Sequence, residues 1–410
     1  MEGFFAKKEV QSLSRPDGKL RTCNTCGLYS CVKTPKMQPY GNFNKGIMCI
    51  GEAPGETEDS VGKPWQGKAG QLLQKTFRKL GIDLFEDCIS INSVNCRPIT
   101  STGGNRTPTG NEIDCCRASI MRYINEYKPH TIILLGGTAL QSVVFHRWKK
   151  NTGGINKWRG WCIPDQDLNA WICPVFHPSY VMRYDTVEMY RIWEDDLLRV
   201  FEISDSPLPK YQKPVIHIVD NLAALDTIKS GTVAIDYETT GLKPYQLDKN
   251  HRIISVSVSI DENTAYVFLL PEKRKDWQPL KRLLMDSRVG KMAHNMKFED
   301  VWSRIYLETP VRNWVWDSML AAHIIDNRSG VTGLKFQTYV NFGVIDYSSE
   351  ISPYLMAVDG KNANSVNRIE ELLTHSSKVK DLLHYNALDT IYQYRLATLQ
   401  MKQMNNNESN

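Results

Sequence analysis

The sequence predicts an α/β protein of two domains, the first built on a parallel sheet and the second on a mixed sheet covered by helices. The chain has 410 residues, which is enough for two cores of ordinary size. Short apolar runs alternate with helical patterns in the first half, whereas strand patterns come first and helical patterns follow in the second. Between the halves, the proline-rich segment SDSPLPKYQKP can continue neither a helix nor a central strand.

In the first half, strands and helices are expected to alternate. The expected strands are short apolar runs at 47–50, 88–94, 131–137 and 171–177. Helices are expected at 69–82 and 112–127, where apolar residues recur at helical spacing. This alternation is typical of a parallel sheet, because parallel strands need a helical crossover between them.

In the second half, β-branched and aromatic runs precede a largely helical region. The expected strands lie at 215–219, 232–238, 252–260 and 264–270, and helices are expected from 277 to the end. The expected domain organisation is a first domain at 1–204, a linker at 205–214, a second domain at 215–402 and a polar tail at 403–410.

Composition limits the function classes only mildly. The formal net charge of +5 is modest for this length, so any surface for nucleic acid has to be local rather than a global basic field. No basic-then-apolar leader and no run of about 18 apolar residues is present, so a soluble, cytoplasmic protein without a membrane partner is expected.

Ten cysteines are present, and in a reducing compartment closely spaced ones are better metal or cluster ligands than disulfide partners. Cys23 and Cys26 form a C-x2-C pair that can converge on one metal or cluster. Two more thiolates are needed, and the candidates are Cys96 and Cys116, with Cys115 and Cys31 as competitors. A zinc knuckle or simple free thiols are the alternatives. Buried free thiols are expected at Cys49, Cys88, Cys162 and Cys173.

Several short motifs accompany these cysteines, each next to an expected strand or helix: GEAPG, PWQGKAGQLL, INSVNCRP and HPSYVMR. With them, residues 23–183 resemble the iron–sulfur uracil-DNA glycosylases of family 4. The resemblance implies a uracil-DNA glycosylase-like fold and a structural [4Fe–4S] cluster. Its ligands would be Cys23, Cys26, Cys96 and, by the family spacing, Cys116 rather than Cys115. The loop ITSTGG has no histidine, so the resemblance excludes the branch that traps uracil covalently.

The same resemblance implies roles in base excision, which needs an extruded base and stabilised negative charge on the leaving ring. Trp65 would stack on the base where the family usually has Phe, Asn92 would read the uracil edge, and His177 would donate to O2. Glu52 and the backbone at Gly51 would lie near the sugar, and Ser179 and Arg183 would fix the HPSY loop against phosphate. Substitutions at 65, 66 and 99 leave open a domain that binds DNA without excising uracil.

A second set of motifs lies after residue 230. Asp236 and Glu238 are two residues apart on an expected strand, so both carboxylates lie on one face and can share a divalent metal. Tyr385 and Asp389 are four residues apart and share one helical face. With the intervening block HNMKFED, residues 215–400 resemble the DEDD 3′-5′ exonucleases, in the tyrosine-containing subclass that proofreads for family A DNA polymerases.

This resemblance implies an RNase H-like fold and phosphodiester cleavage by two Mg²⁺ or Mn²⁺ ions. Asp236, Glu238 and Asp389 would hold the metals, and Tyr385 would orient the attacking water. In the middle block the family spacing points to Glu299, where the family usually has Asp, with Asp300 as the alternative. The substrate would be single-stranded DNA or a frayed 3′ end.

Three functions compete at this point. No polymerase pattern follows the exonuclease-like segment, so we expect a phage-type replication protein that proofreads for a separately encoded family A DNA polymerase. One alternative is a bifunctional uracil-excision repair enzyme. The other is a proofreading subunit whose first domain only binds DNA or docks the polymerase.

Overall fold

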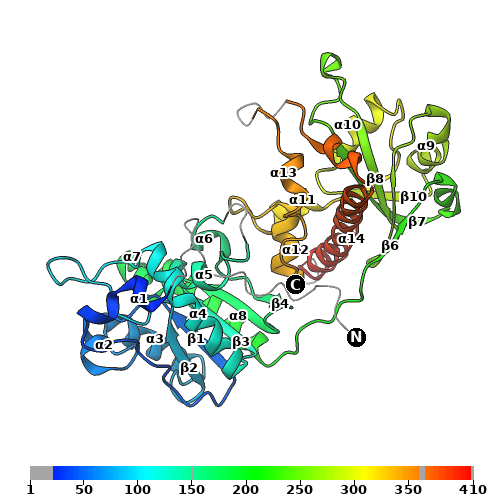
Figure 1. Cartoon of the computed structure of the whole chain (residues 1–410). Coiled ribbons are helices and arrows are strands. Elements are labelled where there is room, and N and C mark those ends of the chain that lie inside the picture. The colour runs from blue at the N-terminus through cyan, green and yellow to red at the C-terminus, as the bar shows by residue number, and fades with distance from the viewer. Residues whose placement is uncertain (1–21, 149–151, 360–364, 408–410) are drawn as a thin grey trace. The chain divides into compact units, whose positions relative to one another are not determined.

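The computed structural model describes residues 22–148, 152–359 and 365–407. It divides into two compact units, Met1–Pro209 and Lys210–Asn410, so the division falls inside the segment expected to be a linker (Figure 1). Residues 1–21 of the expected first domain and residues 408–410 of the expected tail lie outside the described residues. A search of the described helices finds none with the length and apolar character of a membrane span.

The first unit is built on a five-stranded sheet in the order β2-β1-β3-β5-β4. Parallel pairing joins β1 (Ile47–Gly51), β2 (Cys88–Asn92), β3 (Thr131–Leu135) and β5 (Ala170–Val175). The edge strand β4 (Ile163–Asp165) is antiparallel to β5 and was not expected from the sequence. Every residue of the parallel strands is buried, which explains why they read as continuous apolar runs.

Helices connect these strands, as the alternating pattern predicts. They are α1 (Cys23–Cys26), α2 (Glu56–Val61), α3 (Lys68–Lys79), α4 (Gly110–Tyr127), α5 (Gly137–Val143), α6 (Ile155–Trp158), α7 (Pro178–Tyr184) and α8 (Val187–Ser204), with a 3₁₀ turn η1 (Leu28–Cys31). The start of α4 has a capping box, in which the Thr109 hydroxyl accepts from the Glu112 amide and the Glu112 carboxylate accepts from the Thr109 amide.

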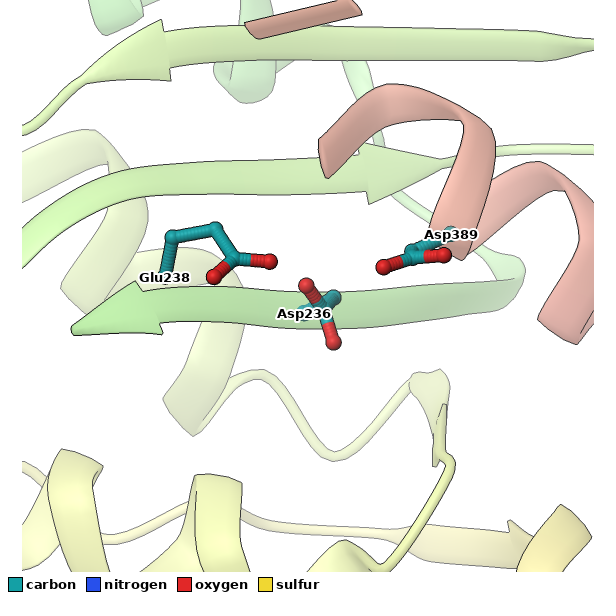
Figure 2. A group of neighbouring side chains, drawn as sticks. All are labelled: Asp236, Glu238 and Asp389. Atoms are coloured by element: carbon teal, nitrogen blue, oxygen red, sulfur yellow. The ribbon is translucent and has the colours of Figure 1, made fainter. Parts of the chain in front are cut away.

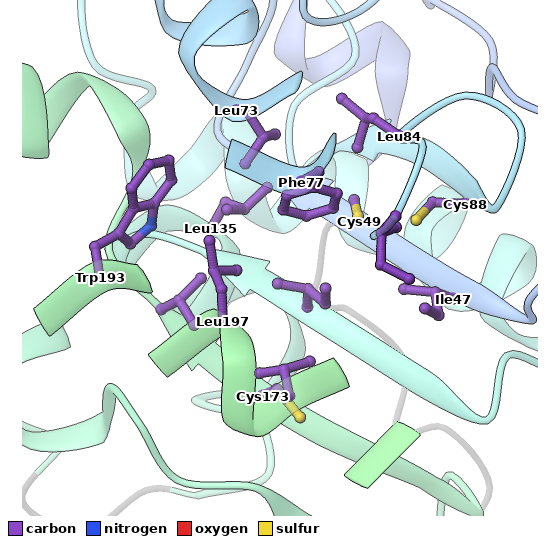
Figure 3. Packing of buried hydrophobic residues seen from close by; sticks show 14 of the residues in the cluster. Ile47, Cys49, Leu73, Phe77, Leu84, Cys88, Leu135, Cys173, Trp193 and Leu197 are labelled. Carbon is purple, nitrogen blue, oxygen red and sulfur yellow. The ribbon is translucent and has the colours of Figure 1, made fainter. Parts of the chain in front are cut away.

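One core cluster of the first unit lies between the sheet and helices α3 and α8 (Figure 3). Leu73 and Phe77 of α3 and Trp193 and Leu197 of α8 are all fully buried in one cluster with side chains of β1, β3 and β5. Cys49, Cys88 and Cys173 are buried in this cluster, and Cys162 packs against it partly buried.

The second unit is built on a six-stranded mixed sheet in the order β11-β10-β7-β8-β9-β6. The strands are β6 (Val215–Ile218), β7 (Gly231–Thr239), β8 (Ile253–Ser259), β9 (Thr264–Leu269), β10 (Val289–Ala293) and β11 (Trp314–Asp317). Strand β8 is antiparallel to both β7 and β9, whereas β10 is parallel to β7 and β11. The predicted fold class, α/β with two such domains, is confirmed.

Helices surround this second sheet. They are α9 (Gln278–Met285), α10 (Met296–Ile305), α11 (Ser318–Ile325), α12 (Leu334–Phe342), α13 (Ser352–Leu355) and α14 (Ser376–Asn407), with 3₁₀ turns η2 (Leu222–Thr227), η3 (Leu247–Lys249), η4 (Arg274–Trp277) and η5 (Ile369–Thr374). The long helix α14 packs on β7, β8 and β9, and α12 packs on α14.

Two expectations about this unit differ from the structure. The region from 277 onward contains strands β10 and β11, which are short and close to the edge of the sheet, so they give little periodic signal. Helix α14 continues to Asn407, so residues 403–407 of the expected polar tail are helical.

Candidate functional sites

Three carboxylates converge in the second unit. Asp236 and Glu238 project from β7 and Asp389 projects from α14, and one oxygen of each lies within 4.8 Å of the others (Figure 2). The two strand residues share a face because side chains alternate along β7. Three acidic groups at this spacing are suited to bind a divalent cation through oxygen.

Hydrogen bonds between α14 and the sheet fix this arrangement. The Asn386 amide donates to Asp236 Oδ2 at 2.6 Å and accepts from the Ser255 hydroxyl at 3.0 Å. One helical turn later, the hydroxyls of Thr390 and Ser257 are 2.6 Å apart. Asn386 and Thr390 therefore anchor the helix face that carries Asp389, although the sequence motifs gave no role to either residue.

The carboxylate site favours protonation when it holds no cation. Burial raises the pKa of Asp236 to about 6, although Lys335 and the amide of Asn386 oppose the shift. Burial, followed by the charge of Asp236, raises the pKa of Glu238 well above its usual range. A bound cation would relieve this repulsion, so the donor set fits a divalent metal.

Glu299 and Asp300, the two candidates of the middle block, lie in different surroundings. Glu299 is buried on α10, and its Oε2 has no hydrogen-bond partner among the described residues. Burial and then the charge of Asp236 raise its pKa well above its usual range. Asp300 instead accepts from Arg304 Nε at 2.6 Å and from the Trp314 indole at 3.1 Å. Glu299 therefore belongs with the carboxylate site electrostatically, although it lies outside the 4.8 Å group.

Tyr385 is buried on α14, one turn before Asp389. Burial, followed by the charge of Glu238, raises its pKa well above the usual range, so the phenol keeps its proton. Two residues that the motifs missed complete this side of the site: Lys335 makes an ion pair with Asp389, and the Tyr347 hydroxyl donates to the same carboxylate at 2.5 Å.

Asp317 is a further residue that the motifs missed. Its Oδ1 accepts from the amides of Asn295, Met319 and Leu320 at 3.1, 2.9 and 3.1 Å, and its Oδ2 accepts from Met296 at 3.0 Å. One carboxylate thus satisfies amides at the starts of both α10 and α11. Because α10 carries Glu299, Asp317 helps to position that side chain.

In the first unit, the four proposed cluster ligands come from three segments. Cys23 and Cys26 lie on α1, Cys96 follows β2, and Cys116 lies on α4, which packs against α1. Cys26, Cys96 and Cys116 pack together in one hydrophobic cluster. After burial, the neighbouring Cys26, Cys23 and Cys96 also raise the pKa of the Cys116 thiol, so the four thiols lie near one another.

Backbone donors surround these sulfur atoms. The Lys36 amide donates to Cys96 Sγ at 3.2 Å, and backbone hydrogen bonds from Leu28 and Asn95 lower the pKa values of Cys26 and Cys116. Burial outweighs them and raises the pKa of Cys116 to about 12. Cys96 and Cys116 are buried, and Cys23 and Cys26 are partly buried. Such thiols with amide donors fit a group bound through thiolates, because the group would supply the positive charge that keeps them ionised.

The competing cysteines have other surroundings. Cys115 Sγ lies 3.4 Å from the Thr25 hydroxyl, within a hydrogen bond that joins α1 to α4. Cys31 is exposed, and its sulfur atom is 3.6 Å from the Ser30 hydroxyl.

Four of the expected uracil-site residues meet at the carboxyl ends of β1, β2 and β5. A Cβ atom at Gly51 would lie 2.6 Å from Asn92 Oδ1 and 2.8 Å from a ring carbon of Trp65, so this close approach requires glycine. The ring centres of Trp65 and His177 are 5.5 Å apart. Asn92, Trp65 and His177 therefore enclose a small region next to the backbone of Gly51.

Trp65 is packed more tightly than an open stacking surface would be. Its side chain belongs to the core cluster and is 6% exposed, and its backbone adopts the left-handed region at φ 59°. The indole N–H has no hydrogen-bond partner among the described residues. The indole thus fills space beside His177 and close to the Asn92 side chain.

His177 is oriented by the residue two positions later. Its Nδ1 accepts from the Ser179 amide at 3.2 Å and lies 2.8 Å from the Ser179 hydroxyl. Burial, and to a lesser degree the charge of Arg183, lowers the pKa of His177 to about 4, so the imidazole is neutral at pH 7. Because Nδ1 accepts, the proton of the neutral ring lies on Nε2, which is left as a donor.

The two remaining residues of this set lie at the edges of the region. Glu52 Oε2 accepts from the Thr138 hydroxyl at 2.9 Å, which ties β1 to the start of α5. Arg183 is exposed in the last turn of α7, and its guanidinium lies 5.8 Å from the ring centre of Tyr180.

Comparisons with known proteins match both units. A family model described as the uracil DNA glycosylase superfamily matches residues 38–197, and one described as 3′-5′ exonuclease matches residues 217–405. The type-4 uracil-DNA glycosylase of Thermotoga maritima is 37% identical over 179 residues, covering 44% of this chain and 88% of that protein. The DNA polymerase of Bacillus phage SP01 is 25% identical over 328 residues, covering 71% of this chain and 34% of that protein.

Among solved structures, Brucella melitensis NrnC is similar to this chain with a TM-score of 0.34 and 22% identity, covering 48% of this chain and 84% of that one.

Proposed function

Because this chain belongs to the uracil-DNA glycosylase superfamily and also carries a 3′-5′ exonuclease domain, we propose that it processes DNA as a metal-dependent 3′-5′ exonuclease. The observation that carries the proposal is the group formed by Asp236, Glu238 and Asp389 inside the exonuclease domain. We place the first domain at 1–204, the linker at 205–214 and the second domain at 215–402.

The residues around this group have complementary roles in the proposed reaction. Asp236, Glu238 and Asp389 would hold two Mg²⁺ or Mn²⁺ ions, and the unpartnered carboxylate oxygen of Glu299 would complete the set. Such ions activate water and stabilise the leaving oxygen in phosphodiester cleavage. Tyr385, whose phenol keeps its proton, would donate a hydrogen bond that orients the attacking water.

For the first domain, the proposed cofactor is a structural [4Fe–4S] cluster held by Cys23, Cys26, Cys96 and Cys116. The proximity of the four thiols, the burial of Cys96 and Cys116 and the backbone donors to sulfur support this assignment. Cys115 is the weaker candidate because its sulfur lies against Thr25, in the contact between α1 and α4.

We further propose that the first domain recognises uracil in DNA. Neutral His177 would donate from Nε2 to the uracil O2 atom, and Asn92 would pair with the polar edge that distinguishes uracil from cytosine. Glu52 and Gly51 would lie on the sugar side, and Ser179 and Arg183 would contact the DNA backbone.

One observation favours a second candidate function for this domain, namely binding DNA or a polymerase without excision. Trp65 fills the region between Asn92 and His177 and is 6% exposed. A flipped base would have to displace the indole. The backbone of Trp65 also has a strained, left-handed φ.

The proposed biological setting is phage replication beside a separately encoded family A DNA polymerase. The support is the similarity to a Bacillus phage SP01 protein named DNA polymerase, which extends over 71% of this chain. Proofreading would then mean trimming single-stranded or frayed 3′ ends for that partner.

A single experiment separates these functions. A single-stranded oligonucleotide with one internal uracil is incubated with anaerobically purified protein in EDTA or in Mg²⁺, treated with alkali and sized. For the exonuclease, the expected result is a 3′ ladder in Mg²⁺. The ladder should be lost in Asp236→Ala and kept in the matched surface variant Asp248→Ala. Alkali-dependent cleavage at the uracil in EDTA would establish the glycosylase as well.

The same experiment defines the outcomes that contradict the proposals. If Asp236→Ala digests DNA at the wild-type rate, the metal assignment is wrong. If uracil stays intact in EDTA while the cluster is present, the first domain serves binding or assembly instead of excision.

A further inference from the structure

The carboxylate site already contains a cation of the protein's own. Lys335, on the first turn of α12, makes an ion pair with Asp389, and its Nζ donates to the Tyr347 hydroxyl at 3.0 Å. The side chains of Lys335 and Asp389 are 18% and 7% exposed. The ammonium is therefore directed inward to the carboxylate group, away from bulk water.

Two aromatic rings complete the surroundings of this ammonium. Nζ lies 4.2 Å from the ring centre of Tyr347 and 4.3 Å from that of Tyr385. Aromatic faces attract a cation, and more strongly where it is desolvated. One oxygen each of Asp236, Glu238 and Asp389 lies within 4.8 Å of the others, so an ammonium in contact with Asp389 lies close to the whole carboxylate group.

Lys335 and a metal ion would compete for the same oxygen. Tyr347 and Lys335 both contact Asp389 Oδ1. Mg²⁺ needs its oxygen ligands at about 2.0–2.1 Å and in octahedral directions, which an ammonium in contact with the same oxygen blocks. A second positive charge a few ångströms away also repels the ion.

We propose that Lys335 is a positioning residue that serves as the counter-ion of the metal-free carboxylate site and is displaced from Asp389 when a divalent ion binds. The inference rests on the proposed function, because it assumes that Asp236, Glu238 and Asp389 bind metal. When no divalent ion is bound, the positive charge of Lys335 offsets the repulsion between the carboxylates, and in doing so it weakens the affinity for metal.

The test measures metal affinity directly. Full-length protein is stripped with EDTA, exchanged into chelator-free buffer and titrated with Mn²⁺, and free Mn²⁺ is followed by its paramagnetic resonance signal. Lys335→Met should bind Mn²⁺ about 10-fold more tightly than the wild type. Lys335→Arg, which keeps the charge, should bind no more tightly than the wild type. The matched control is Lys281→Met. It removes an ammonium of α9 that lies over the Trp277 ring, and it should leave the Mn²⁺ affinity unchanged.

Thermal unfolding supplies a second readout. Lys335→Met should melt at a lower temperature than the wild type in EDTA, and Mn²⁺ should raise its melting temperature by more than it raises that of the wild type. A residue with a merely structural role would lower both melting temperatures without tightening the metal.

The outcomes separate this inference from the proposed function. If the wild type binds no Mn²⁺ at the site, both fail. If the wild type binds Mn²⁺ and Lys335→Met binds it equally or more weakly, only the role of Lys335 is wrong. Should Lys335→Met fail to fold, Tyr347→Phe removes a partner of both Lys335 and Asp389, and is expected to tighten Mn²⁺ several-fold. Unchanged or weaker binding in that variant overturns the inference.

Discussion

Replacing Asp317 with alanine should loosen two helix starts at once and release Glu299 from its position. Four amides at the starts of α10 and α11 donate to this one carboxylate, at distances from 2.9 to 3.1 Å. The alanine variant offers no acceptor to any of them. Because α11 begins directly after Asp317 and α10 begins at Met296, both first turns lose their cap.

The cost can be worked out from these bonds. Loss of an aspartate cap at one helix costs about 0.5–2 kcal/mol. Loss of the charge-assisted bonds to the second helix adds about 1.5–3 kcal/mol. We therefore expect the unfolding free energy of the second unit to fall by about 2–5 kcal/mol. Exonuclease activity should fall as well, since Glu299 lies in the first turn of α10.

Hydrogen exchange read by mass spectrometry gives the local measurement, and urea unfolding gives the global one. Peptides covering 290–325 should exchange faster in Asp317→Ala than in the wild type. The matched control is Asp226→Ala, which breaks an exposed ion pair with Arg282 outside 290–325 and should lower the unfolding free energy only slightly. If exchange in 290–325 is unchanged and the urea midpoint matches that of the control, Asp317 does not hold the two helix starts.

Three further predictions follow from the other contacts. Trp65→Phe should open the region between Asn92 and His177 and raise uracil binding or excision by about 10-fold. The assay uses a uracil-containing oligonucleotide in EDTA. Equal or lower activity would mean that the indole does not obstruct the base. Burial raises the pKa of Asp236 to about 6 in the folded protein. Its contribution to the stability of the metal-free fold is therefore fully present below about pH 4 and is lost as pH rises through 6. The loss is at most about 3 kcal/mol. Urea unfolding in EDTA from pH 4.5 to 7.5 should show a steeper slope in the wild type than in Asp236→Asn, where the buried Glu238 and Glu299 still contribute. Cys116→Ala should lower iron content and visible absorbance after anaerobic purification, whereas Cys115→Ala should keep both. The reverse pattern would mean that Cys115, not Cys116, is the cluster ligand.

The sequence was most informative where the candidate functional residues lie close together along the chain. Periodicity alone predicts that two carboxylates on alternate residues of a strand share one face of the strand. It likewise predicts that a tyrosine one turn before an aspartate shares one face of a helix with it. The alternation of apolar runs and helices likewise predicts the parallel sheet of the first unit. The short strands β10 and β11 escaped because four or five residues near a sheet edge carry no clear period.

The residues that sequence reasoning missed act across tertiary contacts. Lys335 reaches Asp389 from α12, 54 residues away in the chain, and Asn386 reaches Asp236 across 150 residues. Asp317 looks like an ordinary helix cap in the sequence, and only the folded chain brings the start of α10 to the same carboxylate. Such roles have no local signal, because a lone lysine or asparagine in a helix is usually only solvated or packed.

Helix α14 carries Tyr385 and Asp389 within one unbroken stretch of 32 residues, which extends over roughly 48 Å. Because α14 is one continuous helix packed on three strands, Tyr385 and Asp389 lie on a single rigid element and are expected to shift together rather than separately. If the proposed exonuclease acts on a bulkier or mismatched 3′ end, the adjustment is expected from β7 and the first turn of α10, which supply the other carboxylates. Tolerance for varied DNA ends would therefore be tuned by changes in α10 and the loop after β7, while the long helix stays a fixed reference.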